Sequence, residues 1–310
     1  MEKDGHNRSV EGVLATLAGA SAWGLSGTCV QFLFSQTSLN PLVITTLRQL
    51  GAAIPFLLLS LATQREALKG LLSCRETRLR LLIFGSFGLF LNSMLYSTAI
   101  AYTNAGTATV LQSLSIVFVL AIICTQGHRK PRSLELVALA CALAAVFLIA
   151  THADPSSLYL PPLGLAFGIA TAAAATFYTM YPKPLFERWG SLPVTSVGML
   201  TGGLTGLVGC LATDNLPTLT SCMSGAMGTS GLLVLLISTL IGTFAAYGLY
   251  LHGISIVGPL WGNMLGAAEP VSATVISAIW LHTSFSPSDW AGLALMVVTI
   301  VLVSLQSERG

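Results

Sequence analysis

Apolar residues along this chain come in ten blocks of roughly 20, the number that a helix needs to cross the hydrocarbon core of a membrane. A water-soluble helix would carry a polar stripe along each block, and such stripes are absent here. The pattern therefore predicts an all-α integral membrane protein with ten transmembrane helices. We expect these helices near residues 12–34, 41–62, 81–102, 104–125, 134–151, 161–182, 193–213, 230–251, 258–281 and 289–305.

The composition also favours a membrane protein. Of the 310 residues, 54% are hydrophobic and 8% are charged, whereas a soluble domain is about 25% charged. The mean hydropathy is +0.78. The six cysteines form neither a CxxC pair nor a cluster with histidine, so neither a metal site nor a disulfide framework is indicated. We expect a lipid bilayer as the surroundings, and no cofactor, metal or nucleic-acid partner.

The positions of lysine and arginine predict the orientation, because cytoplasmic loops hold the excess of these residues. With a cytoplasmic N-terminus, thirteen of the fourteen basic residues fall in cytoplasmic tails or loops. The fourteenth, Arg48, lies inside a membrane block. The sequence therefore predicts cytoplasmic tails at 1–11 and 306–310, with both termini on the same side of the membrane.

The two halves of the chain resemble each other at a shift of 154 positions. Each half holds five expected helices, an odd number, so the second half must run in the opposite sense to the first. The pattern predicts an inverted repeat, with 12–151 as the first half and 161–305 as the second. Transporters built in this way hold their substrate between the two halves. Chance matching of apolar sequence is the alternative. The matched pairs are Leu95-Tyr96 with Leu249-Tyr250, Ala99-Ile100 with Gly253-Ile254, and Ser115-Ile116 with Glu269-Pro270.

Five short features carry a family resemblance: Trp23-Gly24, Arg48 after Pro41, the run Tyr96–Ala101, Glu269-Pro270, and Trp290-Ala291-Gly292. With these features the chain resembles the drug/metabolite transporter superfamily, in its EamA-like ten-helix branch, over nearly its whole length. The resemblance implies two inverted five-helix halves and carriage of amino acids, metabolites, cations or drugs, commonly outward. The chain departs from the family at Ile116, where proline is usual in the fourth helix.

Glu269 lies deep within an apolar block, eleven positions after the first residue of the ninth expected helix. A charge at such depth costs about 2.5–3.5 kcal/mol, so the carboxylate should face protein or water. Gly258 and Gly262 share its side of the expected helix, where they let another helix approach closely. The position suits binding of a substrate amine or transfer of a coupling proton. A carboxyl group that is hydrogen-bonded to a neighbouring helix is the alternative.

Arg48 is the second charged residue well within an apolar block, seven positions from the outer end of the second expected helix. Its guanidinium can meet a substrate carboxylate or pair with Glu269. It can equally extend outward to the lipid headgroups, because it lies only about 10 Å deep at 1.5 Å per residue. The sequence leaves these alternatives open.

Uncharged polar and aromatic residues complete the candidate site. Thr109, Gln112 and Ser115 share an arc of about 120° on the fourth expected helix. The repeat matches Thr109 with Asn263 and Ser115 with Glu269. Hydrogen bonding between helices is the alternative role for each of them. The expected binding or coupling residues are Glu269, Arg48, Gln112, Thr109, Ser115, Asn263, Trp23 and Asn92.

Several other classes of membrane protein lack their motifs here. An intramembrane aspartyl enzyme needs two membrane aspartates, and all four aspartates fall in tails, loops or helix boundaries. The chain holds no GxSxG elbow and no GxxxxGK[ST] phosphate loop. We therefore expect no catalytic residues and no enzyme activity. A lipid scramblase or an intramembrane enzyme is kept as the alternative to a carrier.

The sequence thus predicts a secondary active transporter that moves a small metabolite by alternating access. The substrate classes in view are an amino acid, an amine and a drug-like compound, with export as the expected direction and a proton as the candidate coupling ion. We expect a multi-pass protein of a bacterial cell (inner or plasma) membrane, either a monomer or a homodimer.

Overall fold

The computed structural model describes residues 2–37, 39–127, 130–154, 158–223 and 227–307, with the side chains of 2–9, 223, 258–261, 263 and 303–307 outside that description. Every regular element within these residues is a helix, which confirms the all-α class. The first half holds α1 (Glu2–Gln36), α2 (Pro41–Thr63), α3 (Arg65–Ser73), α4 (Arg75–Ile83), η1 (Phe84–Leu91), α5 (Asn92–Tyr102), α6 (Ala105–Gln112), α7 (Ser115–Gln126) and α8 (Ser133–Thr151). The second half holds α9 (Pro162–Met180), α10 (Lys183–Trp189), α11 (Ser191–Ala212), α12 (Leu216–Met223), α13 (Gly228–Leu236), η2 (Ile237–Ala245), α14 (Ala246–Gly266), α15 (Ala268–Trp280) and α16 (Pro287–Ser307).

Eight helical stretches in the described residues are long and apolar enough to cross a membrane. Two shorter apolar helices, Met264–Trp280 and Pro287–Leu302, follow them. The fold is therefore that of an α-helical membrane protein. The eight stretches are Val10–Gln36, Pro41–Thr63, Arg75–Tyr102, Ala105–Gln126, Ser133–Thr151, Pro162–Trp189, Ser191–Ala212 and Gly228–Val257.

The segment 63–80 is expected from the sequence to be a loop, and this expectation is wrong. The helices α3 and α4 occupy most of it. Leu68 and Leu71 of α3 are buried, while the charged residues of α3 face outward. A short amphipathic helix of this kind is invisible to a search for apolar blocks of membrane length, because half of its residues are polar.

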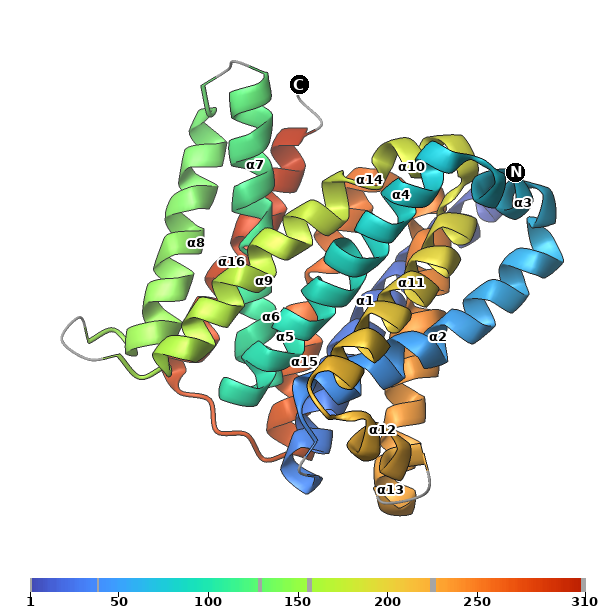
Figure 1. The fold of residues 1–310 in the computed structure, drawn as a ribbon. Helices are drawn as coiled ribbons and strands as arrows, with labels where there is room; N and C mark the ends of the chain where they lie inside the picture. The colour runs from blue at the N-terminus through green and yellow to red at the C-terminus, as the bar shows by residue number, and fades with distance from the viewer. Residues whose placement is uncertain (1, 38, 128–129, 155–157, 224–226, 308–310) are drawn as a thin grey trace.

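The helices pack mainly in pairs that are distant in the sequence. α1 lies along α14 and α15, α2 along α11, and α5 along α9. α8 packs against α16, and with α7 these helices form a group at one side of the bundle, at the left of Figure 1. The helices α3, α4 and α10, the start of α1 and the end of α16 all lie at one end of the bundle, and α12 and α13 lie at the other (Figure 1).

Glycine allows a very close contact between η1 and α11. A Cβ atom at Gly85 would lie 2.7 Å from the carbonyl oxygen of Gly198, and one at Gly202 would lie 2.7 Å from the carbonyl oxygen of Gly85. Such distances leave no room for a side chain. The two helices therefore touch backbone to backbone, as small residues permit in membrane bundles.

We predict that Gly85→Ala destabilises the fold, because the neighbouring α11 backbone cannot move away from the added methyl group. Overpacking of this kind costs about 1–3 kcal/mol. Gly248→Ala in α14 is the matched control, because a Cβ there meets nothing within 4 Å. Thermal unfolding of purified protein in detergent should show a lower midpoint for Gly85→Ala and an unchanged or higher one for Gly248→Ala. Equal midpoints would contradict the close packing of η1 on α11.

Four interruptions of regular α-helix within the described bundle form two pairs under the shift of 154. Two are the π-helical segments η1 and η2, and the shift of 154 carries 84–91 onto 238–245, within η2. The other two are breaks at 113–114, between α6 and α7, and at Ala267, between α14 and α15. The same shift carries residue 113 onto residue 267. The two breaks fall within the expected helices 104–125 and 258–281, each of which the structure divides in two.

Tyr96 and Tyr250, which the shift of 154 relates, each form a hydrogen bond across a turn of the chain. The Tyr96 hydroxyl lies 2.6 Å from Thr109 Oγ1, across the turn between α5 and α6. The Tyr250 hydroxyl donates to the carbonyl oxygen of Gly262 at 3.2 Å. A straight helix would separate two residues twelve positions apart by about 18 Å. The chain therefore reverses its direction within α14.

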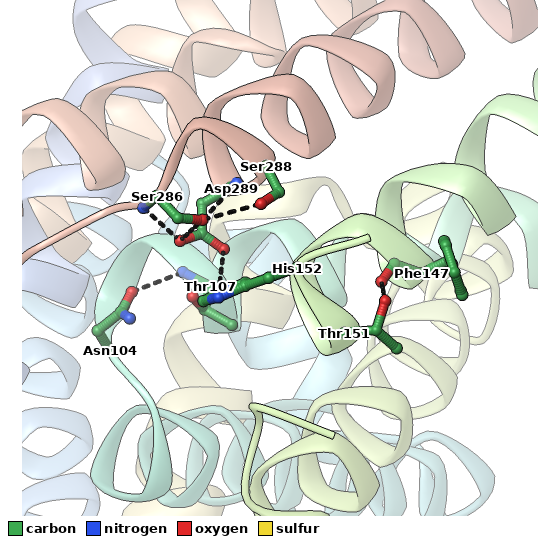
Figure 2. A network of polar contacts seen from close by, with 8 residues as sticks. All are labelled: Asn104, Thr107, Phe147, Thr151, His152, Ser286, Ser288 and Asp289. Atoms are coloured by element: carbon green, nitrogen blue, oxygen red, sulfur yellow. Dashed lines mark hydrogen bonds and ion pairs between the residues drawn. The ribbon is translucent and has the colours of Figure 1, made fainter. Parts of the chain in front are cut away.

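The start of α16 is fixed by a polar network (Figure 2). The Ser286 N–H donates to Asp289 Oδ2 at 2.7 Å, and His152 Nε2 at the end of α8 lies 3.5 Å from Asp289 Oδ1. The Arg132 N–H donates to Glu135 Oε2 at 2.7 Å, which gives α8 a matching cap. The shift of 154 relates these two caps as well, and each satisfies a backbone donor at a helix start.

Candidate functional site

A cavity of about 170 Å³ lies among helices of both halves of the bundle. Its lining comes from ten elements, whereas α7, α8 and α16 contribute no residue to it. Twelve of the sixteen lining residues carry a polar or charged side chain, when the three tyrosines are included. The lining residues are Trp23, Ser26, Thr45, Arg48, Gln49, Leu89, Asn92, Ser93, Tyr96, Gln112, Tyr178, Met199, Gly242, Thr243, Tyr247 and Glu269.

The cavity collects buried polar atoms that have no partner within the protein. Six such side-chain atoms occur among the described residues, and four of them belong to the cavity lining. These four are Arg48 Nε, Gln49 Oε1, Asn92 Oδ1 and Gln112 Oε1. Buried polar groups are nearly always hydrogen-bonded in folded proteins. Their concentration in one place indicates a surface that is built to bond a polar ligand.

Arg48 is held by hydroxyl groups rather than by an acid. Its Nη2 donates to Ser26 Oγ on α1, and to Thr243 Oγ1 on η2 at 3.4 Å. The Nε–H remains without a partner. A guanidinium that keeps its charge and free N–H donors is well suited to a carboxylate, which accepts two parallel hydrogen bonds.

Glu269 lies in the first turn of α15, directly after the break at Ala267. Its carboxylate receives no hydrogen bond and forms no ion pair within the described part of the chain, although Arg48 lines the same cavity. The start of a helix carries a partial positive charge that favours a carboxylate. The break thus provides a favourable position for an acid that keeps its side chain available in the cavity.

Aromatic rings line one part of the cavity. The ring of Trp23 lies edge-on to Tyr247 with centroids 5.2 Å apart, and 4.7 Å from the ring of Tyr250. The hydroxyls of Tyr178 and Tyr247 contact one another. Faces of such rings attract alkylammonium groups and pack against apolar side chains.

Five of the eight residues expected from the sequence line this cavity: Trp23, Arg48, Asn92, Gln112 and Glu269. Thr109 lies behind the lining, because it bonds the hydroxyl of the lining residue Tyr96. Ser115 does not line the cavity, and its carbonyl oxygen accepts a hydrogen bond from Thr176 at 3.3 Å. Asn263 belongs to α14, but its side chain falls outside the described residues.

The sequence reasoning missed several lining residues. Gln49 follows Arg48 directly and is a polar side chain in an apolar block, which is the same signal that singled out Gln112. Ser26 and Thr243 gave no signal, because hydroxyl side chains are common in membrane helices and usually bond their own backbone. Tyr178 lies close to the end of α9, where an interfacial tyrosine is expected.

The chain is similar to known transporters over almost its whole length. The model of the EamA-like transporter family matches residues 10–151 and again 162–305. An uncharacterized inner membrane transporter of Salmonella typhimurium, YicL, is 33% identical over 299 residues, which are 96% of this chain and 97% of the relative. The uncharacterized transporter YwfM of Bacillus subtilis is 26% identical over 299 residues, 96% of this chain and 94% of the relative. A crystal structure of a protein at 17% identity shares the fold, with a TM-score of 0.62 over 95% of this chain and 99% of that one.

The fold and these similarities define a multi-pass membrane transporter of the bacterial inner membrane. More specifically, the chain belongs to the EamA-like transporter family. The relatives named above are themselves uncharacterized, so what the cavity binds has to be argued from its own residues.

We predict that Gln112→Met stabilises the protein, because it removes a buried acceptor that has no partner and keeps the length of the side chain. The gain should be about 1 kcal/mol in the free energy of unfolding. Gln31→Met is the matched control. Gln31 Nε2 donates to Thr283 Oγ1, and Gln31 Oε1 accepts from the Ala105 N–H.

Thermal unfolding should therefore show a higher midpoint for Gln112→Met and a lower one for Gln31→Met. A lower midpoint for both variants would mean that the Gln112 amide is satisfied in the folded protein. In that case its place in a ligand site would lose its support.

Proposed function

We propose that the chain is a secondary transporter that exports a small metabolite with an amino group and a carboxylate, such as an amino acid, by alternating access. The cavity is its binding site. The observation that carries this proposal is that Arg48 and Glu269 line the same cavity without forming an ion pair with each other. A zwitterion supplies the missing partner to each of them.

The dimensions and the lining agree with such a substrate. A volume of about 170 Å³ suits a molecule of amino-acid size rather than a lipid. The unpartnered amide oxygens of Gln49, Asn92 and Gln112 can accept hydrogen bonds from the amino group of the substrate. The aromatic rings around Trp23 can pack against its side chain.

We further propose ten membrane crossings, arranged as inverted repeats over 12–151 and 161–305 between tails at 1–11 and 306–310. The two matches to one family model support this arrangement, as do the paired π-helical segments and paired breaks. The reversal inside α14 supplies the ninth crossing, since the chain runs back through α15. Binding between two opposed halves is the usual arrangement in such transporters.

Glu269 is the proposed coupling group. A proton that binds this carboxylate from the outer side removes its attraction for the substrate amine, so the substrate is released there, and the proton leaves the carboxylate on the cytoplasmic side before the next substrate binds. The position of Glu269 on a lining helix start, between the two halves, supports this role.

The experiment that tests the function uses purified protein in proteoliposomes and three compounds of similar shape: L-phenylalanine, 3-phenylpropionate and phenethylamine. The first carries both charged groups, and the others carry one each. We expect saturable, protein-dependent flux of L-phenylalanine and at most weak flux of the two singly charged compounds. Equal flux of all three compounds would argue against a zwitterion site, and phospholipid movement without flux of any compound would favour a scramblase.

We predict that Glu269→Gln abolishes flux driven by a pH gradient while the variant remains folded, because the amide can neither carry the proton nor attract the amine. Arg48→Met should weaken L-phenylalanine binding by about 10- to 100-fold, the range for loss of hydrogen bonds to a charged group. Glu187→Gln, on exposed α10, is the control. Gradient-driven flux at the wild-type rate in Glu269→Gln would rule out the coupling role.

The proposed orientation predicts which cysteine an impermeant maleimide reaches. Cys74 lies between α3 and α4, and the neighbouring Thr77 hydroxyl lowers the pKa of its thiol, which enlarges the reactive thiolate fraction at neutral pH. Cys222 is buried, and burial raises the pKa of its thiol. We expect rapid labelling of Cys74 in inside-out vesicles and none in intact cells, with Cys74→Ser as the control. Labelling in intact cells would reverse the orientation.

A further inference from the structure

A small network of hydroxyl groups connects Arg48 to the π-helical segment η2. Ser26, which accepts from Arg48, lies with its Oγ 3.2 Å from Ser238 Oγ and 3.4 Å from the Ser238 carbonyl oxygen. Thr243, the second acceptor for Arg48, donates from Oγ1 to the same carbonyl oxygen at 3.1 Å. Ser238 is fully buried, and it is not part of the cavity lining.

This network depends on the local geometry of η2. Thr243 bonds the carbonyl group five residues before it, which is the π-helical spacing. A change of η2 to α-helical geometry rotates Thr243 relative to Ser238 and so separates this hydroxyl from that carbonyl. The backbone of η2 is also tight against α1, because a Cβ atom at Gly242 would lie 3.0 Å from the Cα atom of Ser26.

The neighbouring residue on α2 is connected differently. Gln49 Nε2 donates to Ser93 Oγ, two residues beyond the end of η1, at 3.4 Å. Successive residues of α2 therefore reach toward the two π-helical segments, Gln49 toward the first and Arg48 toward the second. Of these two residues, only Arg48 is hydrogen-bonded to the hydroxyl network of Ser26 and Thr243 in the described part of the chain.

We propose that Ser26, Ser238 and Thr243 are positioning residues that hold the Arg48 guanidinium in the cavity while η2 is π-helical. The availability of the cation in the binding site then depends on the helical geometry of the second half. A substrate carboxylate that draws Arg48 away from Ser26 and Thr243 loosens η2, and a change in η2 releases Arg48. The consequence for transport rests on the proposed function, whereas the connection itself does not.

The test is amide hydrogen exchange of the purified protein without substrate, read on peptides that cover 237–245 and 84–91. We expect Arg48→Met, Ser238→Ala and Thr243→Val each to speed exchange in η2 by about fivefold or more. Exchange in η1 should remain within about twofold of the wild type. Thr243→Ser keeps the hydroxyl and should restore the wild-type rate in η2.

The double variant Arg48→Met/Thr243→Val decides between a connection and two separate effects. If the network joins Arg48 and Thr243, the η2 amides of the double variant exchange no faster than those of either single variant. Thr239→Val, also in η2, is the matched control, because the Thr239 hydroxyl donates to the Leu235 carbonyl oxygen of α13 and forms no hydrogen bond with Arg48. Its effect should add to that of Arg48→Met.

Unchanged η2 exchange in Arg48→Met would overturn the proposal, as would effects of Arg48→Met and Thr243→Val that add in full. No substrate is needed, so the outcome is independent of the flux measurements. A protein that transports none of the three compounds can still show the connection, and one that transports them can lack it.

Discussion

The constraint on which the structure depends is that hydrocarbon offers no partner to a backbone N–H or C=O group. Regular helix is therefore required wherever the chain faces lipid, and irregular backbone is tolerated only where protein or a polar cavity supplies partners. The interruptions obey this rule. The π-helical segments contribute Leu89, Gly242 and Thr243 to the cavity lining, and the breaks are adjacent to the lining residues Gln112 and Glu269. All four of these interruptions therefore line the cavity or lie next to a residue that does.

Buried charge imposes the second condition. A guanidinium and a carboxylate that share a cavity would ordinarily be stabilised as an ion pair, and here each is supported separately. Hydroxyls of Ser26 and Thr243 hold Arg48, while the start of α15 supports Glu269. Both arrangements are weaker than a pair of opposite charges, and both leave capacity for further hydrogen bonds. Arg48 Nε and the Glu269 carboxylate thus keep capacity for hydrogen bonds that the described residues do not use, and this capacity is what the proposed function assigns to the substrate.

The sequence predicted the helical membrane class, and it singled out five cavity residues, because a polar or charged side chain in an apolar block is costly and visible. It did not predict η1 or η2. The segment 84–91 is apolar and rich in phenylalanine and glycine, as ordinary membrane helices are, and its close packing on α11 involves residues far away in the sequence. The role of Ser238 was equally invisible, because it depends on a contact between residues 212 positions apart.

The two halves match in geometry more closely than in chemistry. The shift of 154 carries Tyr96 onto Tyr250 and relates the breaks in the helices, yet it places Ser115 where the second half has Glu269. In an inverted pair, similar frameworks allow either half to adopt the conformation of the other. The charges do not exchange in this way, because the one carboxylate among the lining residues belongs to the second half. The two halves therefore differ in charge more than in framework, since the charged lining residues are Arg48 in the first half and Glu269 in the second.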